Sequence, residues 1–177
     1  MTISQEIWIT KGYEIFALEG AKSLKIESLS KKVGISKSSF YHHFADMEVF
    51  KEFLLQYHIK QAHVIAEKER LAKNVEPELI NVLIAHKIDL LFNRQLRIHR
   101  DHKNYADILI KSNAIVGNAF VMVWVKDLNL QLNQKQLEGI FELATENFYL
   151  QIHSENLNYS WLVNYFTNLK KIAARFV

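Results

Sequence analysis

Hydroxyl, cationic and aromatic side chains gather within one short stretch of the chain. In order they are Ser36, Lys37, Ser38, Ser39, Tyr41 and His42. Hydroxyl groups and a phenol can donate hydrogen bonds to phosphate oxygens, and a lysine can reach a phosphate or the O6 and N7 atoms of guanine. The alternative is an ordinary solvent-exposed helix in which the serines serve only as helix caps. The composition of this stretch therefore raises the hypothesis of contact with nucleic acid.

Helical periodicity places most of this cluster on one side. Phe40 and Phe44 are four residues apart and face inward together, so that Ser38, Ser39, Tyr41 and His42 occupy the outer half with Lys37 at its edge. A helix with an aromatic inner stripe and polar outer groups suits the major groove of DNA. The stretch predicts a recognition helix.

The residues before this cluster predict a second helix and a tight turn. Ile26, Leu29 and Val33 form one apolar stripe. Gly34 supplies the permissive backbone that a turn between two helices needs, and Ser36 is a good N-cap for the next helix. Together the two segments predict a helix-turn-helix unit.

The same residues resemble a known family. Residues 34–44 fit the pattern G-[VI]-S-x-x-[ST]-[LF]-Y-x-[HY]-F, which is the signature of tetracycline-repressor (TetR) family regulators. The likeness extends back through residues 15–17 and Gly20 and forward into residues 46–50, and covers roughly the first 55 residues. The resemblance implies a homodimeric regulator that binds a near-palindromic operator in double-stranded DNA, most often as a repressor released by a small molecule.

The resemblance also assigns roles to single residues. It implies that Tyr41 contacts phosphate and that His42 shares its exposed face. Lys25 stands where many members carry a serine or threonine cap, and offers a cation to a phosphate. Met47, two residues after Ala45, stands where members often place a lysine. We therefore expect fewer phosphate contacts and a modest affinity for the operator.

The whole chain reads as all-α, because it has one proline, five glycines and no clear alternating runs. We expect an N-terminal three-helix helix-turn-helix bundle over residues 1–47. A long fourth helix, capped by Asp46 and continuing to about Ala72, would join it to a C-terminal helical ligand and dimerisation domain over residues 48–177. After a hinge at residues 73–77, the apolar spacing from Leu79 to Leu90 predicts a helix. The polar residues 93–103 are expected to form a short helix or helical turn with a bend.

Further helices are expected over residues 105–126, 134–153 and 158–176, with a loop at 129–133 and a capping box between Asn133 and Gln136. The last two helices carry many large apolar side chains. The resemblance implies that they pair with those of a second subunit, whereas burial within one subunit is the alternative.

A small-molecule pocket is expected between Phe92 and Trp124, although each residue is also an ordinary core residue. The candidate lining residues are His86, Phe92, Leu96, Tyr105, Phe120, Trp124 and Phe141. An apolar effector would fit such a site. His86 or Tyr105 would orient it.

Other classes of function find little support. No nucleophile–base pair, phosphate loop or dinucleotide fingerprint is visible, so we expect neither an enzyme nor a cofactor. His99 and His102 lack a third convergent ligand for a metal. The chain has no cysteine, signal peptide or membrane span, which favours the cytoplasm. The remaining alternative is a TetR-like ligand-binding or interaction protein that has lost operator binding.

Overall fold

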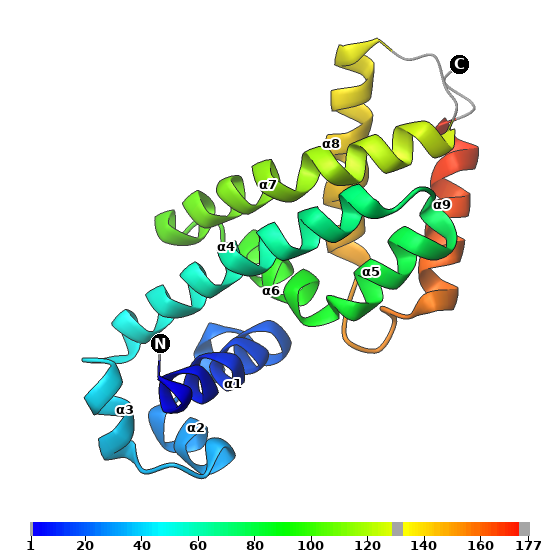
Figure 1. Ribbon diagram of the computed structural model, residues 1–177. Coiled ribbons are helices and arrows are strands. Elements are labelled where there is room, and N and C mark those ends of the chain that lie inside the picture. The colour runs from blue at the N-terminus through cyan, green and yellow to red at the C-terminus, as the bar shows by residue number, and fades with distance from the viewer. Residues whose placement is uncertain (1, 129–132, 174–177) are drawn as a thin grey trace.

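The computed structural model describes residues 2–128 and 133–173, and every regular element within them is helical (Figure 1). The all-α prediction is confirmed. The predicted loop at 129–133 and the end of the last helix near residue 176 lie mostly outside the described residues. The helices are α1 (Ile3–Glu19), η1 (Ala21–Ser23), α2 (Ile26–Val33), α3 (Lys37–His43), α4 (Met47–Leu71), η2 (Val75–Leu79), α5 (Ile80–Ala85), α6 (Lys87–Ile98), α7 (Lys103–Leu128), α8 (Gln134–Gln151) and α9 (Tyr159–Ala173).

The first three helices form a small head around aromatic side chains. Trp8 and Phe16 on α1 are buried, as is Phe40 on α3. The side chain of Thr2 caps α1 by accepting a 3.2 Å hydrogen bond from the backbone N–H of Gln5. The inward-facing positions predicted for Phe40 and Phe44 are confirmed, since both rings are buried.

The turn between α2 and α3 depends on Gly34. Its φ of 72° lies in the left-handed region that favours glycine, and its N–H donates to the carbonyl of Ser30 at 3.0 Å. The hydroxyl of Ser30 in turn donates to the carbonyl of Ile35 at 2.5 Å. These contacts hold the angle between the two helices.

The long fourth helix runs from the head into the rest of the chain. Asp46 caps it through a 2.8 Å hydrogen bond from the backbone N–H of Val49, as the sequence predicted. Over its C-terminal part α4 lies beside α7 (Figure 1). A second connection joins the head to the body, because α1 packs along α6.

One helix prediction in the body was wrong. The expected helix from Leu79 to Leu90 breaks at His86, whose φ of −108° and ψ of 27° separate α5 from α6. The prediction for residues 93–103 is confirmed, because the chain is helical up to Ile98 at the end of α6 and then bends at residues 99–102. The predicted capping box of α8 is confirmed, with both hydrogen bonds between Asn133 and Gln136 at 3.0 Å.

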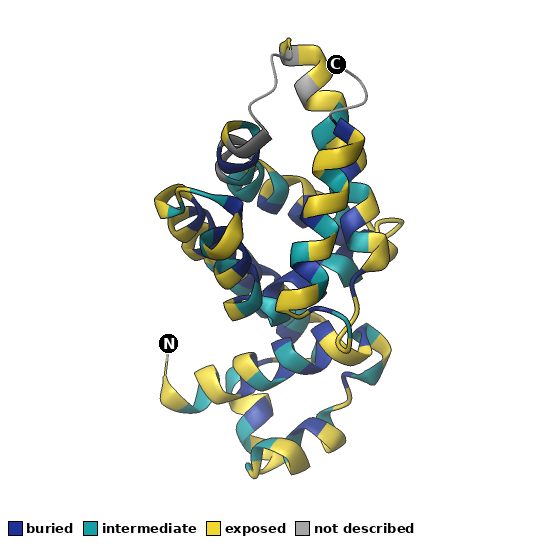
Figure 2. Cartoon of the chain, turned by 90° about the vertical axis from the view of Figure 1, so that its right-hand side faces the viewer, coloured by how far each residue is buried: buried dark blue, intermediate teal, exposed yellow. Residues whose placement is uncertain are grey.

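Buried residues face the inner sides of the helices, and exposed residues follow the outer sides (Figure 2). Within the described residues no helix combines the length and apolar character that crossing a membrane would require.

Candidate functional site

The position of α3 is set by an aromatic cluster beneath it. The ring of Phe40 packs edge-on against Trp8 of α1 at 5.4 Å and against Phe50 of α4 at 5.2 Å, measured between ring centroids. Phe44 adds contacts to the same rings of α3 and α4. Aromatic pairs at these separations stabilise the packing beyond their buried area. The inner face of α3 is therefore held by the head, and its outer face is left to solvent.

Most of the predicted DNA-contacting residues lie on that outer face. Exposed side chains are those of Lys25, Ser36, Lys37, Ser38, Tyr41 and His42. Tyr41 keeps 56% of its surface exposed. Ser39 is half-buried, because its Oγ lies 3.4 Å from the Oγ of Ser4 on α1. Ser39 thus faces the seam between α1 and α3 more than solvent.

Ser36 and Lys37 on this face make contacts that the sequence did not predict. Ser36 occupies the N-cap position, but its side chain makes no capping hydrogen bond and instead lies 2.8 Å from the Oγ of Ser38. Lys37 Nζ forms an ion pair with Glu27 Oε1 at 2.7 Å, between the starts of α3 and α2. The hydrogen bond from Lys37 lowers the pKa of Glu27 and raises that of Lys37. Lys37 is thus already paired with an exposed carboxylate, that of Glu27.

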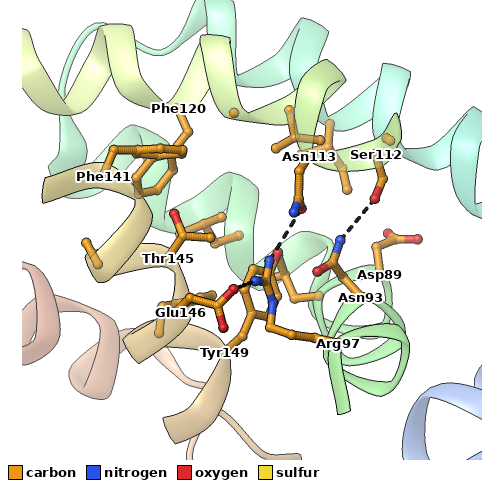
Figure 3. Close-up of a pocket in the computed structure, with 18 of the residues that line it drawn as sticks. Asp89, Asn93, Arg97, Ser112, Asn113, Phe120, Phe141, Thr145, Glu146 and Tyr149 are labelled. Carbon is orange, nitrogen blue, oxygen red and sulfur yellow. Dashed lines mark hydrogen bonds and ion pairs between the residues drawn. The ribbon is translucent and has the colours of Figure 1, made fainter. Parts of the chain in front are cut away.

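A cavity of about 340 Å³ lies in the body, and its lining residues come from each of the α-helices from α4 to α9. One stripe of α4 faces it, formed by His58, Ala62, Ile65 and Glu69. Figure 3 shows the aromatic rings of Phe120 and Phe141 at one end and polar side chains of α6 and α7 at the other. The volume is at the small end of ordinary ligand sites.

The head matches one known sequence family. The sequence model described as "Bacterial regulatory proteins, tetR family" matches residues 9–50, which span most of α1 and all of α2 and α3. Residues 9–50 thus resemble the TetR family, and the rest of the chain lies outside this match. The match includes the Gly34 turn and all the predicted contact residues of α3.

Known proteins resemble this chain in sequence or in fold. YerO of Bacillus subtilis (strain 168), an uncharacterized HTH-type transcriptional regulator, is 26% identical over 118 residues. The match covers 67% of this chain but only 39% of YerO. Two solved structures share the fold. A transcriptional regulator of the TerR/AcrR family from Aquifex aeolicus VF5 has a TM-score of 0.62 at 16% identity, covering 98% of this chain and 99% of that one. A regulator from Rhodococcus sp. assigned to the TetR family has a TM-score of 0.58 at 15% identity and covers 98% of both chains.

Of the seven predicted cavity residues, two line the cavity of the body, Phe120 and Phe141. The other five lie elsewhere. Phe92 stacks between Tyr13 and Phe16 at 4.2 and 4.3 Å, and Tyr105 packs edge-on against Phe16 at 5.7 Å. Leu96 and Trp124 are buried in the core. The ring of His86 forms hydrogen bonds with Asp89 and Lys68. Phe92 and Tyr105 thus belong to the packing of α1 against the body.

Several polar cavity residues were missed by the sequence analysis. Arg97 forms an ion pair with Glu146 and lies 4.7 Å from the ring centre of Tyr149. Asn93 donates to Ser112 Oγ at 3.2 Å (Figure 3). One signal could have found part of this site, since His58 and Glu69 interrupt the apolar stripe of α4 at helical spacing.

A buried hydrogen-bond chain leads from the cavity wall to the head. The hydroxyl of Tyr13 donates to Asp89 Oδ1 at 2.9 Å and lies 2.7 Å from His58 Nδ1. Asp89 Oδ2 lies 2.8 Å from His86 Nδ1, and the Nε2 of the same ring lies 2.8 Å from Lys68 Nζ. Burial lowers the pKa of His58 to about 4, so its ring is neutral near pH 7.

No group of three or more metal-ligating side chains converges within the described part of the chain. His99 and His102 lie at the end of α6 and just before α7.

Proposed function

We propose that this protein is a TetR-family transcriptional regulator that binds double-stranded DNA as a homodimer. The observation that carries the proposal is the exposure of the predicted contact residues. Six of the seven are exposed, five of them on α3 or at its N-cap and the sixth, Lys25, at the N-cap of α2. We take residues 1–47 as the DNA-binding unit and residues 48–177 as the regulatory and dimerisation unit.

Each contact residue has a distinct role in this proposal. The hydroxyls of Ser36, Ser38 and Tyr41 donate to phosphate oxygens, and Ser39 supports the face from the α1 seam. Lys37 reaches a phosphate or a guanine once it leaves Glu27. Lys25 and His42 flank the groove. Phosphate contacts set the register on the duplex, and base contacts set the sequence.

The dimer forms through α8 and α9 in this proposal. Leu143 and Leu150, seven residues apart on α8, are 74% and 72% exposed, and Ile172 on α9 is 52% exposed. Phe148, Leu162 and Phe166 of the same helices are buried within the subunit. Both expectations for these helices thus find support, since their apolar residues divide between the subunit core and an exposed face that a second copy would cover. A two-fold dimer requires half-sites about 34–36 Å apart, which is one helical turn of DNA.

We propose that the regulator is a repressor and that a small molecule in the cavity releases it from DNA. The support is that α4 and α6 both line the cavity and both contact the head through Tyr13. A coupling of about 1–3 kcal/mol between ligand and DNA would be enough to change operator occupancy.

The test begins with selection of binding sites from random duplex DNA, followed by binding measurements on the selected site. We expect a near-palindromic site, and we expect Tyr41→Phe to weaken binding to it by about 10- to 100-fold, the effect of one lost hydrogen bond to a charged group. Tyr159→Phe on α9 is the control and should leave DNA affinity unchanged. If Tyr41→Phe binds as tightly as the unaltered protein, with the same helical content and dimerisation, the assignment of α3 is wrong.

A second candidate function is a TetR-like ligand-binding or interaction protein without operator binding. The observation favouring it is that Lys37 is already paired with Glu27, while Ala45 and Met47 bring no cation to the start of α4. Site selection separates the two candidates, because this protein would enrich no palindrome at any salt concentration.

A further inference from the structure

One carboxylate in the cavity wall has no partner. The side chain of Glu69 on α4 has no exposed surface, and neither of its oxygens has a hydrogen-bond partner within the described residues. Burying an ionised carboxylate without a partner costs several kcal/mol, so Glu69 keeps its proton near pH 7 and would ionise only beside a cation. A buried, unpaired carboxyl that lines a cavity is suited to a ligand that brings a positive charge.

Two further acceptors lack donors in the same cavity. Asn93 Oδ1 is buried and unpaired, because this amide uses its nitrogen on Ser112. His58 Nε2 is also unpaired. Since the Tyr13 hydroxyl donates its proton to Asp89, it accepts one from His58 Nδ1, which leaves a bare lone pair on Nε2. Glu69, Asn93 and His58 thus all offer acceptors.

Acidic side chains also outnumber basic ones among the described residues that line the cavity. Among the described lining residues, the carboxylates are Glu69, Asp89, Glu142 and Glu146, and the one guanidinium is Arg97. Arg97 is engaged by Glu146, and Asp89 already accepts from Tyr13 and His86. The Nε of Arg97 is buried and unpaired, but no hydrogen bond or ion pair joins Arg97 to Glu69 within the described residues.

The rest of the wall is apolar and aromatic, with the rings of Phe120, Phe141 and Phe148 among its lining residues. Aromatic faces attract cations as well as apolar groups. We propose that the cavity binds a small organic cation, an apolar or aromatic body carrying one charged nitrogen that pairs with Glu69. This rests on the proposed function, in which it names the chemical class of the effector.

The experiment compares two probes of the same shape and different charge. Benzyltrimethylammonium carries a permanent cation, and neopentylbenzene is its neutral carbon analogue. Calorimetric titration of the full-length dimer without DNA should show the cation binding about 10- to 100-fold more tightly than the neutral probe, the range for one interaction with a buried charge. Glu69→Gln, which keeps the shape of the side chain, should abolish that preference.

Glu67→Gln is the matched control, because Glu67 is an exposed carboxylate on the same helix. It should keep the preference for the cation. The proposal is overturned if the neutral probe binds as tightly as the cation. It is also overturned if the preference survives in Glu69→Gln, or if the cation fails to bind at about 1 mM. Thermal unfolding of each variant verifies that it is folded.

The same samples separate this inference from the proposed function. Operator binding is measured independently with selected DNA, with and without the cationic probe. Cation binding without any DNA binding would support the ligand class and contradict the regulator. DNA binding without cation binding would support the regulator and contradict the ligand class.

Discussion

The hydroxyl of Tyr13 on α1 donates a 2.9 Å hydrogen bond to Asp89 on α6. Its oxygen also lies 2.7 Å from the ring of His58 on α4, and both His58 and Asp89 line the cavity. Burial first, and the neighbouring Asp89 second, raise the pKa of Tyr13 well above its ordinary value, so this hydroxyl keeps its proton. One tyrosine of the head is therefore hydrogen-bonded to two helices that line the cavity.

Removing that hydroxyl tests the connection. Tyr13→Phe leaves buried Asp89 with one donor fewer, and we expect it to lower the free energy of unfolding by about 1–3 kcal/mol. Denaturant unfolding followed by circular dichroism measures this. Tyr57→Phe is the control, because the Tyr57 hydroxyl forms no hydrogen bond within the described residues while its ring packs edge-on against Tyr13 at 4.9 Å. Equal effects of the two substitutions would contradict the role of the hydroxyl.

The contact between α1 and α4 has no room for a side chain at Gly12. A Cβ there would lie 2.4 Å from Cζ of Phe50, whose ring is fully buried. We expect Gly12→Ala to destabilise the protein by about 1–3 kcal/mol, which outweighs the gain of about 1 kcal/mol in helix propensity.

Gly139 on α8 provides the matched control, since nothing lies within 4 Å of a Cβ at that position. Gly139→Ala should raise the melting temperature through propensity alone. A melting temperature of Gly12→Ala at or above that of the unaltered protein would show that the head can accommodate the methyl group.

We expect the ion pair between Lys37 and Glu27 to compete with DNA for the lysine. Glu27→Gln removes a negative charge near the groove face and frees Lys37, so we expect DNA binding to tighten by about two- to five-fold at low salt. Fluorescence anisotropy with the selected site measures the change. In a Lys37→Met background the gain should shrink, and an undiminished gain there would mean that Glu27 acts by general repulsion alone.

Glu69 makes stability depend on pH. Burial raises its pKa from 4.5 to about 8, against a smaller opposing effect of Arg70. Between these values the unfolded chain releases the proton while the folded protein keeps it. The contribution of Glu69 to stability is thus present below pH 4.5 and is lost as the pH rises to 8, by up to about 1.4 kcal/mol per pH unit.

Glu69→Gln should remove this slope, so that its stability relative to the unaltered protein increases from pH 5 to pH 8. Denaturant unfolding at each pH unit measures it, with Glu67→Gln in parallel as the exposed control. A stability difference that is the same at all four pH values would mean that Glu69 has a partner in solution.

The head was predictable because its signals are local. Asp46, Gly34 and the pair Phe40 and Phe44 each act within a few residues of chain, through a cap, a turn and a helical stripe. The capping function expected of Ser36 failed because a neighbouring hydroxyl, Ser38, competes for its side chain.

The cavity was not predictable in the same way because its wall is assembled from helices far apart in the sequence. Phe92 and Tyr105 have the apolar character expected of a pocket, yet α1 covers them. Glu69 was missed because a single carboxylate on a long helix has the pattern of an exposed residue. The break at His86 had no glycine or proline to announce it.

The packing of α1 along α6 has a mechanical consequence. The head is fixed to the body twice, by the covalent continuity of α4 and by the rings and hydrogen bonds around Tyr13 and Phe92. Such a closed linkage has no free pivot at residue 46. A change in the spacing between the two recognition helices of a dimer would require α1 to slide over α6, and we therefore expect shear between packed helices in place of a hinge.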